Sequence, residues 1–243
     1  MMHLDLNRRT GGLWTIADDQ TFSIGCAAKN CNTINYQQTI AKIRRYEKHL
    51  MSFQTGLPHD SICFLNQEHG DKIIEISSGQ SDNDLFCGTA DAMITERKNI
   101  MLVIRTADCV PVFIADNENS VVAAVHSGWR GTASDITGKT IAYLIEKFSS
   151  KPENLRVYIL PSIGVEYYEV GKEVADNFSG CIITIDGKYF LDMKSAIIYS
   201  LKNKGVANNN IFASFYDTFR DNDSFFSHRK GDVGRNLNYI YLK

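Results

Sequence analysis

The sequence predicts a single α/β domain in which a mixed β-sheet is flanked by helices. Apolar blocks of strand length alternate along the chain with segments of helical periodicity, which is the pattern of layered α/β and α+β proteins. The 243 residues contain no internal repeat, no low-complexity linker and no cluster of prolines that would mark a domain boundary. Hydrophobic residues make up 44% of the chain, which excludes disordered and fibrous classes. We therefore expect one domain over residues 1–243.

The first elements expected along the chain are a helix and two strands. An amphipathic helix is predicted over residues 35–51. Its apolar residues recur at helical intervals with basic residues between them: Ile40, Ile43, Tyr46 and Leu50. Strands are predicted over 61–70 and 71–77, with Gly-Asp turn chemistry between them, so that His69 falls at a strand end.

Four apolar blocks rich in Val and Ile form the centre of the expected sheet. Their composition predicts strands buried on both faces. These blocks are 91–95, 100–106, 110–116 and 121–126. Only residues 117–120 separate the last two blocks, which is too short for a crossover, so we expect a hairpin and a sheet of mixed direction.

Helices and strands continue to alternate in the second half. A helix capped by Ser134 or Asp135 is predicted to end before Lys151 and Pro152. Two more helices are predicted from the spacing of Val170, Val174 and Phe178 and of Met193, Ile197 and Leu201, the latter capped by Asp192 and ending near Gly205. Strands are expected at 156–161, 181–185 and 211–215.

Charge and cysteine usage limit the partners and the compartment. The 26 basic and 28 acidic residues give a net charge of −2, so we expect no nucleic-acid or membrane partner and only a local anion site. The sequence contains no signal peptide and no apolar stretch of membrane-spanning length, which predicts a cytoplasmic protein. Six scattered cysteines without a CxxC pair favour reduced thiols.

Three segments place reactive side chains beside turn residues at strand ends: NQEHGD with His69, RTADCVPV with Cys109 and AAVHSGWRGT with His126. A thiolate and two imidazoles provide three ligands for tetrahedral zinc and leave one position for water or substrate. Asp91 is a candidate carboxylate to orient a ligand imidazole. The plainer interpretation is that the thiol is a small buried hydrophobe and that each imidazole bonds a backbone carbonyl.

The same residues also fit a Cys-His hydrolase. Cys109 would be the nucleophile, His126 or His69 the base, and Asp108 or Asp91 the orienting carboxylate. Both interpretations remain open on the residues alone.

Two glycine-containing segments are candidates to hold an anion. SGWRGT, with Ser127 and Arg130, joins a strand to an expected helix, and a tight turn with Trp129 on the core and Arg130 in a surface ion pair is its structural alternative. FFSHRKGDVGR gathers cationic side chains whose guanidinium groups can hold phosphate, although a solvated turn would have a similar composition. Its candidate residues are His228, Arg229 and Arg235.

Taken in order, NQEHGD, TADCVPVFIAD, AAVHSGWRGT, PSIGVEYYEVG and FFSHRKGDVGR resemble the multicopper polyphenol oxidase or laccase-domain family, also called the YfiH family. The resemblance implies a single α/β domain and a zinc ion bound by His69, Cys109 and His126. It further implies phosphorolysis of adenosine, inosine, guanosine and S-methyl-5′-thioadenosine to free base and ribose 1-phosphate, with adenosine deaminase activity. Copper is also expected to bind such a ligand set.

Within that resemblance, we expect Arg229 and Arg130 to hold phosphate, with Ser127 as a further donor. Three positions depart from the family pattern. Glu166 and Asp217 stand where the family commonly has cysteines, and His228 stands where it has tyrosine. Because the two carboxylates would add negative charge near a phosphate site, they put substrate preference and rate in question.

The leading hypothesis is therefore a zinc-dependent purine nucleoside phosphorylase, acting as a monomer or a homodimer. Its rivals are the Cys-His hydrolase, with a role in peptidoglycan precursor editing implied by the resemblance, and a non-catalytic zinc-stabilised binding protein. A copper-dependent laccase is the remaining alternative, and it would need several coppers per chain.

Overall fold

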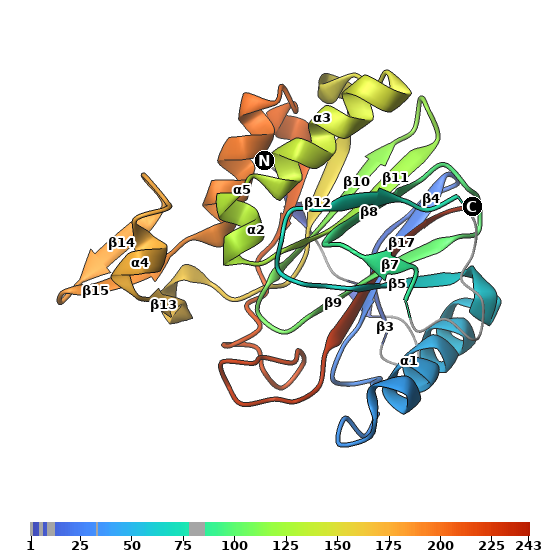
Figure 1. Ribbon diagram of the computed structural model, residues 1–243, viewed down its shortest axis with the longest axis horizontal. Coiled ribbons are helices and arrows are strands. Elements are labelled where there is room, and N and C mark those ends of the chain that lie inside the picture. The colour runs from blue at the N-terminus through green and yellow to red at the C-terminus, as the bar shows by residue number, and fades with distance from the viewer. Residues whose placement is uncertain (1, 5–6, 9–12, 33, 78–85) are drawn as a thin grey trace.

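Two large sheets packed face to face form the centre of the molecule in the computed structural model, which describes residues 2–4, 7–8, 13–32, 34–77 and 86–243 (Figure 1). Sheet I has the strand order β1 (Met2–Leu4), β16 (Ile211–Ser214), β12 (Arg156–Ile159), β10 (Val110–Asp116), β11 (Val121–Ser127), β8 (Ala92–Thr95) and β6 (Ile73–Glu75). Sheet II has the order β2 (Asn7–Arg8), β3 (Leu13–Asp18), β4 (Phe22–Ala27), β17 (Asn236–Leu242), β9 (Met101–Thr106), β5 (Ile62–Asn66) and β7 (Gly88–Thr89). Both sheets mix parallel and antiparallel pairs, so the predicted α/β class and mixed strand direction are confirmed.

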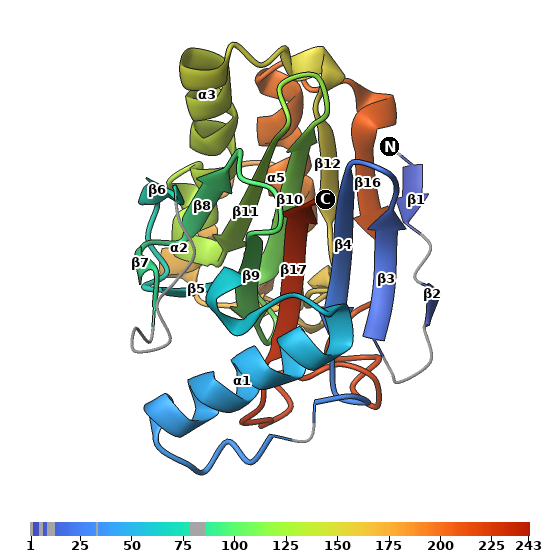
Figure 2. The ribbon, with the colours of Figure 1, turned by 90° about the vertical axis from the view of Figure 1, so that its right-hand side faces the viewer.

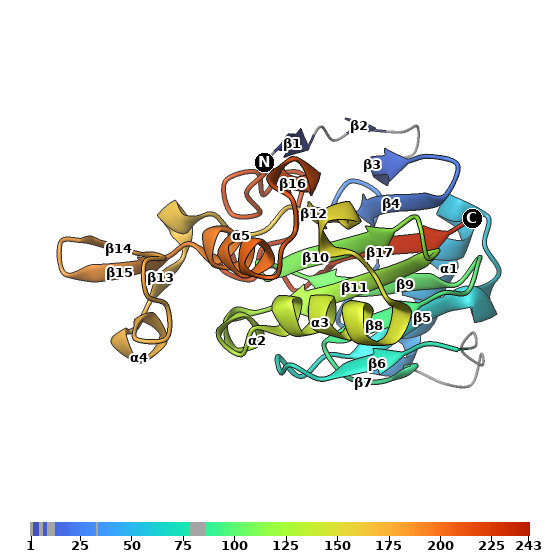
Figure 3. The same ribbon diagram turned by 90° about the horizontal axis from the view of Figure 1, so that it is seen from above.

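Helices cover the outer faces of both sheets. α2 (Trp129–Ala133), α3 (Ile136–Phe148) and α5 (Met193–Asn203) lie on sheet I, and α1 (Ile40–Thr55) lies on sheet II (Figure 2). A small sheet of β13 (Glu169–Val170), β15 (Lys188–Leu191) and β14 (Ile182–Ile185), together with α4 (Lys172–Ala175), projects from one side (Figure 3). Single 3-10 turns occupy His59–Ser61, Pro152–Asn154, Val165–Tyr167 and Asn208–Asn210.

Apolar packing accounts for these layers. Phe22 and Leu102 of sheet II meet Phe113 and Val122 of sheet I in a fully buried cluster between the sheets. A second cluster joins the other face of sheet I to α3 and α5, and a third joins sheet II to Met51 of α1. Because β10 and β11 are covered on both faces, all of their residues are buried, as their continuous apolar runs predict.

The hairpin predicted at residues 117–120 is confirmed. β10 and β11 pair antiparallel from Val110 opposite Ser127 to Asp116 opposite Val121. Asp116 closes the turn by accepting hydrogen bonds from backbone N–H groups two and three residues further on. The start of β10 therefore lies beside the end of β11, which brings Cys109 close to His126.

Several predicted helix boundaries are also confirmed. Asp135 caps α3, accepting from the Gly138 N–H at 3.2 Å, and Asp192 caps α5, accepting from the Ser195 N–H at 2.9 Å. Gly205 follows α5 with a φ of +88°, a conformation that glycine adopts without steric cost.

The prediction for the first helix was wrong in its limits and in its buried face. α1 covers Ile40–Thr55 instead of residues 35–51, because the chain is extended at Thr39 and turns at Gly56 with a φ of +76°. Ile40 and Tyr46 are exposed. The charged residues Arg44, Glu47 and Lys48 are instead buried together with Ile43 and Met51.

The predicted helix through Val170, Val174 and Phe178 was also wrong. Only Lys172–Ala175 are helical, and Val170 belongs to β13. The chain is extended at Gly171 and turns at Gly180 with a φ of +77°, so the apolar spacing does not continue as one helix. The strands expected at 61–70 and 71–77 are shorter than predicted, and β5 and β6 lie in different sheets. Within the described ranges, no helix has the length and apolar character needed to cross a membrane.

Candidate functional site

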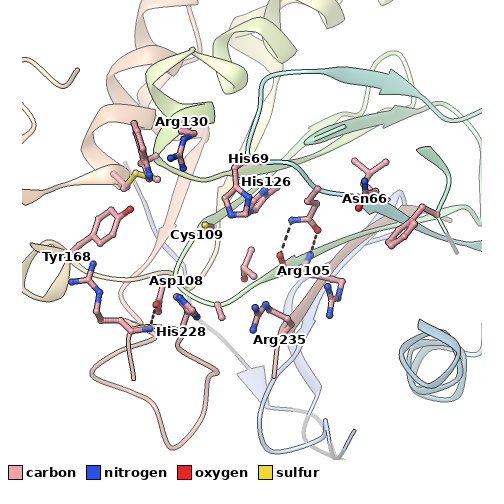
Figure 4. Close-up of a pocket in the computed structure, with 18 of the residues that line it drawn as sticks. Asn66, His69, Arg105, Asp108, Cys109, His126, Arg130, Tyr168, His228 and Arg235 are labelled. Atoms are coloured by element: carbon pink, nitrogen blue, oxygen red, sulfur yellow. Dashed lines mark hydrogen bonds between the residues drawn. The ribbon is translucent and has the colours of Figure 1, made fainter. Parts of the chain in front are cut away.

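The two histidines and the cysteine singled out in the sequence meet at one end of the β10–β11 hairpin (Figure 4). Cys109 immediately precedes β10, His126 lies in β11, and His69 lies in the loop between β5 and β6. Their ligand atoms all lie within 4.8 Å of one another. The two imidazole rings are nearly perpendicular, at 81°, with centroids 4.8 Å apart.

Asp91 holds two parts of this group together. Its carboxylate is buried and accepts a hydrogen bond from His126 Nδ1 at 2.7 Å. The same carboxylate accepts from the backbone N–H groups of His69 at 2.9 Å and Gly70 at 2.7 Å. With the shared proton on Nδ1 of His126, release of the proton from Nε2 leaves a lone pair there for a ligand.

The electrostatics favour the deprotonated thiol. Burial alone would raise the pKa of Cys109, but hydrogen bonds and charge from His126 and His69 lower it to about 6. Burial would lower the pKa of His126, but Cys109 and Asp91 raise it to about 9. Thiolate is the form of cysteine that binds a metal ion.

The donor set fits a zinc ion. Zinc bonds to thiolate sulfur at about 2.3 Å and to imidazole nitrogen at about 2.0–2.1 Å, so two ligands of one ion lie at most about 4.4 Å apart. Atoms that lie within 4.8 Å of one another therefore need only a small approach to share one ion. Gly128 packs against the group, and a Cβ there would stand 3.0 Å from His69 Cδ2 and 3.3 Å from Cys109 Sγ. A side chain at position 128 would therefore press on both ligands, which would have to move by a few tenths of an ångström.

Asp108 is not directed to either histidine. Its buried carboxylate accepts from the Thr218 hydroxyl at 2.7 Å and from the Arg229 backbone N–H at 2.7 Å. It has a φ of +89°, which is unusual for a residue with a side chain. Of the two carboxylates considered for orienting a histidine, Asp91 therefore makes that contact, and Asp108 ties the loop of Arg229 to the strand of Cys109.

A cavity of about 630 Å³ opens over the His69–Cys109–His126 group. Its wall includes the other predicted residues Arg130, His228, Arg229 and Arg235. Arg130 stacks on Trp129 at 4.2 Å, and Arg229 lies 5.5 Å from the ring of Tyr168. Burial raises the pKa of Tyr168 to about 12, so its hydroxyl keeps its proton at neutral pH.

Ser127 lies outside this wall. Its side chain is buried, and its hydroxyl is hydrogen-bonded to that of Thr132 at 2.8 Å. The phosphate contact expected of Ser127 finds no support in this geometry, because its hydroxyl is hydrogen-bonded within the turn. The carboxylates of Glu166 and Asp217 are likewise not part of the cavity wall, and Asp217 accepts from the backbone N–H of Phe219 at 2.8 Å in its own turn.

Sequence reasoning missed the other end of the cavity. Arg44 of α1 and Arg105 of β9 line it, together with Gln67 and Phe86. Arg105 is the next-to-last residue of a strongly apolar strand, and Arg44 lies on a helix face expected to be solvated. No local pattern in the sequence marks either residue.

The fold and the site together define an α/β protein with a His-Cys-His group of metal-ligand composition in a cation-lined cavity. The family model for multi-copper polyphenol oxidoreductase laccase matches residues 24–243. The chain therefore belongs to that laccase-domain family.

Relatives and solved structures agree with the family. The chain is 35% identical over 189 residues to a purine nucleoside phosphorylase of Clostridium acetobutylicum, covering 75% of this chain and 77% of the relative. It is 31% identical over 198 residues to purine nucleoside phosphorylase YfiH of Shigella flexneri, covering 78% and 77%. The crystal structure of Bacillus licheniformis hypothetical protein YfiH has a TM-score of 0.88 at 26% identity, covering 98% of this chain and 99% of that one.

Proposed function

We propose that this protein is a zinc-dependent purine nucleoside phosphorylase formed by one domain over residues 1–243. Its substrates are adenosine, inosine, guanosine and S-methyl-5′-thioadenosine, and it also deaminates adenosine. The observation that carries the proposal is the position of the His69–Cys109–His126 group beside arginines in one cavity. The names of the relatives support the purine nucleoside substrates.

The phosphate site is proposed at Arg130 and Arg229. Both residues line the cavity, and Arg130 lies near the His69–Cys109–His126 group (Figure 4). Arginine offers paired donors in a fixed geometry that matches phosphate oxygens. Aromatic contacts with Trp129 and Tyr168 hold the two side chains in place.

In the proposed phosphorolysis, an oxygen of hydrogen phosphate forms a bond to C1′ of the nucleoside while the bond from C1′ to the purine nitrogen breaks. The bonding electrons leave with the purine, and the proton of the phosphate balances the proton gained by the free base. Arg130 and Arg229 would hold the phosphate charge and orient the attacking oxygen.

His69, Cys109 and His126 would hold zinc, and Asp91 would keep the Nδ1 proton of His126 in place. When bound there, zinc supplies a Lewis acid and lowers the pKa of a water molecule, which is the chemistry that purine deamination needs. His228 and Tyr168 bear protons on the cavity wall and are candidates to contact ribose or base.

Product chromatography of the zinc-loaded protein with adenosine, in the presence and absence of phosphate, tests the proposal. Adenine and ribose 1-phosphate that form only with phosphate, and not with Cys109→Ala, are the expected result. Inosine would reveal the deaminase reaction. No turnover of any of the four nucleosides would refute the assignment.

A Cys-His hydrolase is a second candidate because Cys109, His126 and Asp91 follow one another as nucleophile, base and orienting carboxylate. Thiol alkylation distinguishes the hydrolase from the phosphorylase. Hydrolysis through a covalent thioester requires a free Cys109 thiolate, so a metal-loaded protein whose thiol is protected from alkylation should not catalyse it.

A multi-copper oxidase centre finds no support in the ligand arrangement. Within the part of the chain that the structure describes, His69, Cys109 and His126 are the one group of three or more potential metal ligands. These three residues suit a single ion, and further copper ions would need further ligands.

A further inference from the structure

The end of the cavity missed in the sequence contains three arginines from distant parts of the chain. Arg105 is the next-to-last residue of β9, Arg235 immediately precedes β17, and Arg44 lies on α1. Pairing of β9 with β17 places Arg105 opposite Leu237, so Arg105 and Arg235 approach each other (Figure 4). All three side chains line the cavity.

One carboxylate serves this group. Glu47 is fully buried and accepts from Arg105 Nε at 2.9 Å and from Arg44 Nη1. Arg235 donates to the backbone carbonyls of Val233 at 3.0 Å and Gly234 at 2.8 Å. The described contacts of this group therefore include three positively charged side chains and one negatively charged side chain.

Burial makes this excess of charge significant. Arg44 is only 7% exposed, and its Nε has no hydrogen-bond partner within the described residues. Lys48, one turn further along α1, is 6% exposed, and its Nζ is likewise unpartnered in the described part of the chain. Burial lowers the pKa of Arg44, and burial together with Arg105 lowers that of Arg235. A buried donor of a charged group that has no acceptor is costly unless a ligand supplies one.

Arg105 is also held in place through its backbone. Gln67 accepts from the Arg105 N–H at 2.9 Å and donates to the Arg105 carbonyl at 3.0 Å. Glu47 engages Nε of the side chain, which leaves the Nη groups as donors toward a ligand. This support resembles the second layer of contacts that holds binding residues in a fixed geometry.

We propose that Arg44, Arg105 and Arg235 form a second phosphoryl-binding subsite in the same cavity as Arg130 and Arg229. The proposal rests on the proposed function for the identity of the cavity as a nucleoside site. A nucleoside carries no phosphate, so the phosphoryl group comes either from inorganic phosphate or from the 5′-phosphate of a nucleotide. Both sources offer the tetrahedral oxygens that paired guanidinium groups bind.

Equilibrium binding to the zinc-loaded protein tests this subsite without requiring turnover. The probes are inorganic phosphate, adenosine and adenosine 5′-monophosphate, each titrated into wild type, Arg105→Gln and Arg235→Gln. Arg220→Gln is the matched control, because Arg220 pairs with Asp221 at an exposed position outside the cavity wall. Thermal unfolding of each variant checks that it folds.

We expect each subsite variant to weaken phosphate or nucleotide about tenfold or more, as loss of a charge-assisted contact does, and to leave adenosine unchanged. Weaker phosphate binding would identify inorganic phosphate as the occupant. Loss of the advantage of the nucleotide over adenosine would identify the phosphate ester. Wild-type binding of both probes by Arg235→Gln would overturn the proposal. This variant decides if Arg105→Gln fails to fold, because among the described residues the Arg235 side chain bonds only to neighbouring carbonyls.

The outcome for the proposed function is separate. Binding that weakens as expected, combined with no products from any nucleoside, would support the subsite and refute the phosphorylase. Phosphorolysis with a phosphate affinity that depends on Arg229 alone, together with nucleotide binding that is unchanged in the Arg105 and Arg235 variants, would support the phosphorylase and refute the subsite.

Discussion

Replacing Asp91 by asparagine should weaken the metal site and the fold together. The carboxylate of Asp91 accepts four hydrogen bonds. One oxygen faces His126 Nδ1 and the His69 N–H, at 2.7 and 2.9 Å. The other faces the N–H groups of Gly70 and Glu68, at 2.7 and 3.2 Å. An asparagine amide has one oxygen, so its NH2 group meets two donors in either orientation.

Each orientation has a defined consequence. If the NH2 group faces His126, the imidazole must move its proton to Nε2 and lose the lone pair offered to a metal ion. If it faces Gly70, the loop carrying His69 loses its anchor. Loss of a contact that orients a ligand costs about 10- to 100-fold in metal affinity. The donors left without an acceptor should also lower the free energy of unfolding by about 1–3 kcal/mol.

A competition titration with a zinc-binding dye measures the affinity, and urea unfolding of the metal-free protein measures the stability. Asp116→Asn is a matched control, because Asp116 is also a buried carboxylate that accepts backbone N–H groups, at the opposite end of β10. It should lose stability and keep its zinc affinity. Wild-type zinc affinity in Asp91→Asn would refute the reasoning.

The remaining predictions concern the ligand group, its glycine and a buried lysine. Cys109→Ala should lose more than about 100-fold in zinc affinity, since a missing ligand costs more than a misoriented one; zinc content after dialysis checks this. Gly128→Ala should reduce zinc affinity about tenfold by displacing His69, with the dye titration as the measurement. Lys194, which donates to the Ser214 carbonyl at 2.8 Å, has its pKa lowered by burial to about 8. The unfolded chain therefore binds more protons than the folded one from pH 8 up to the lysine's unfolded pKa of about 10.4, so stability should rise over that interval. Urea unfolding across this interval should show a smaller rise in Lys194→Met; an unchanged rise would contradict the assignment.

The sheet and the hairpin were predictable because their signal is local. β10 and β11 are buried on both faces, so apart from Asp116 and His126 near their ends every residue in them is apolar or small, and a four-residue connection leaves only an antiparallel pairing. Cys109 and His126 then approach each other as a consequence of register. His69 could be suggested as a third member only by its place at a strand end, since β5 belongs to the other sheet.

Hydrophobic periodicity selected the wrong face of α1 for a physical reason. Periodicity assumes that a buried helix face is apolar. Arg44 and Glu47 are buried because they form a charged network with Arg105 at the cavity, a contact between residues 58 positions apart in the case of Glu47 and Arg105. Only the tertiary pairing of α1 with sheet II reveals this network. Because this network joins residues that are distant in the sequence, no local pattern predicts the end of the cavity that contains Arg44, Arg105 and Arg235.

One member of the ligand group and one residue beside it are held in backbone conformations that side chains disfavour. His69 has a φ of +61° and Asp108 a φ of +89°. Such conformations cost on the order of 1–3 kcal/mol each and persist where surrounding contacts determine them. At His69, the contacts come from Asp91, which bonds its backbone N–H. At Asp108, they come from Thr218 and from the backbone of Arg229.

Each buried carboxylate therefore links a ligand to a second segment: Asp91 links the loop of His69 to His126, and Asp108 links the strand of Cys109 to the arginine loop. Because the ligand group and Arg229 share Asp108 as a support, a displacement of Cys109 must also move the proposed phosphate contact.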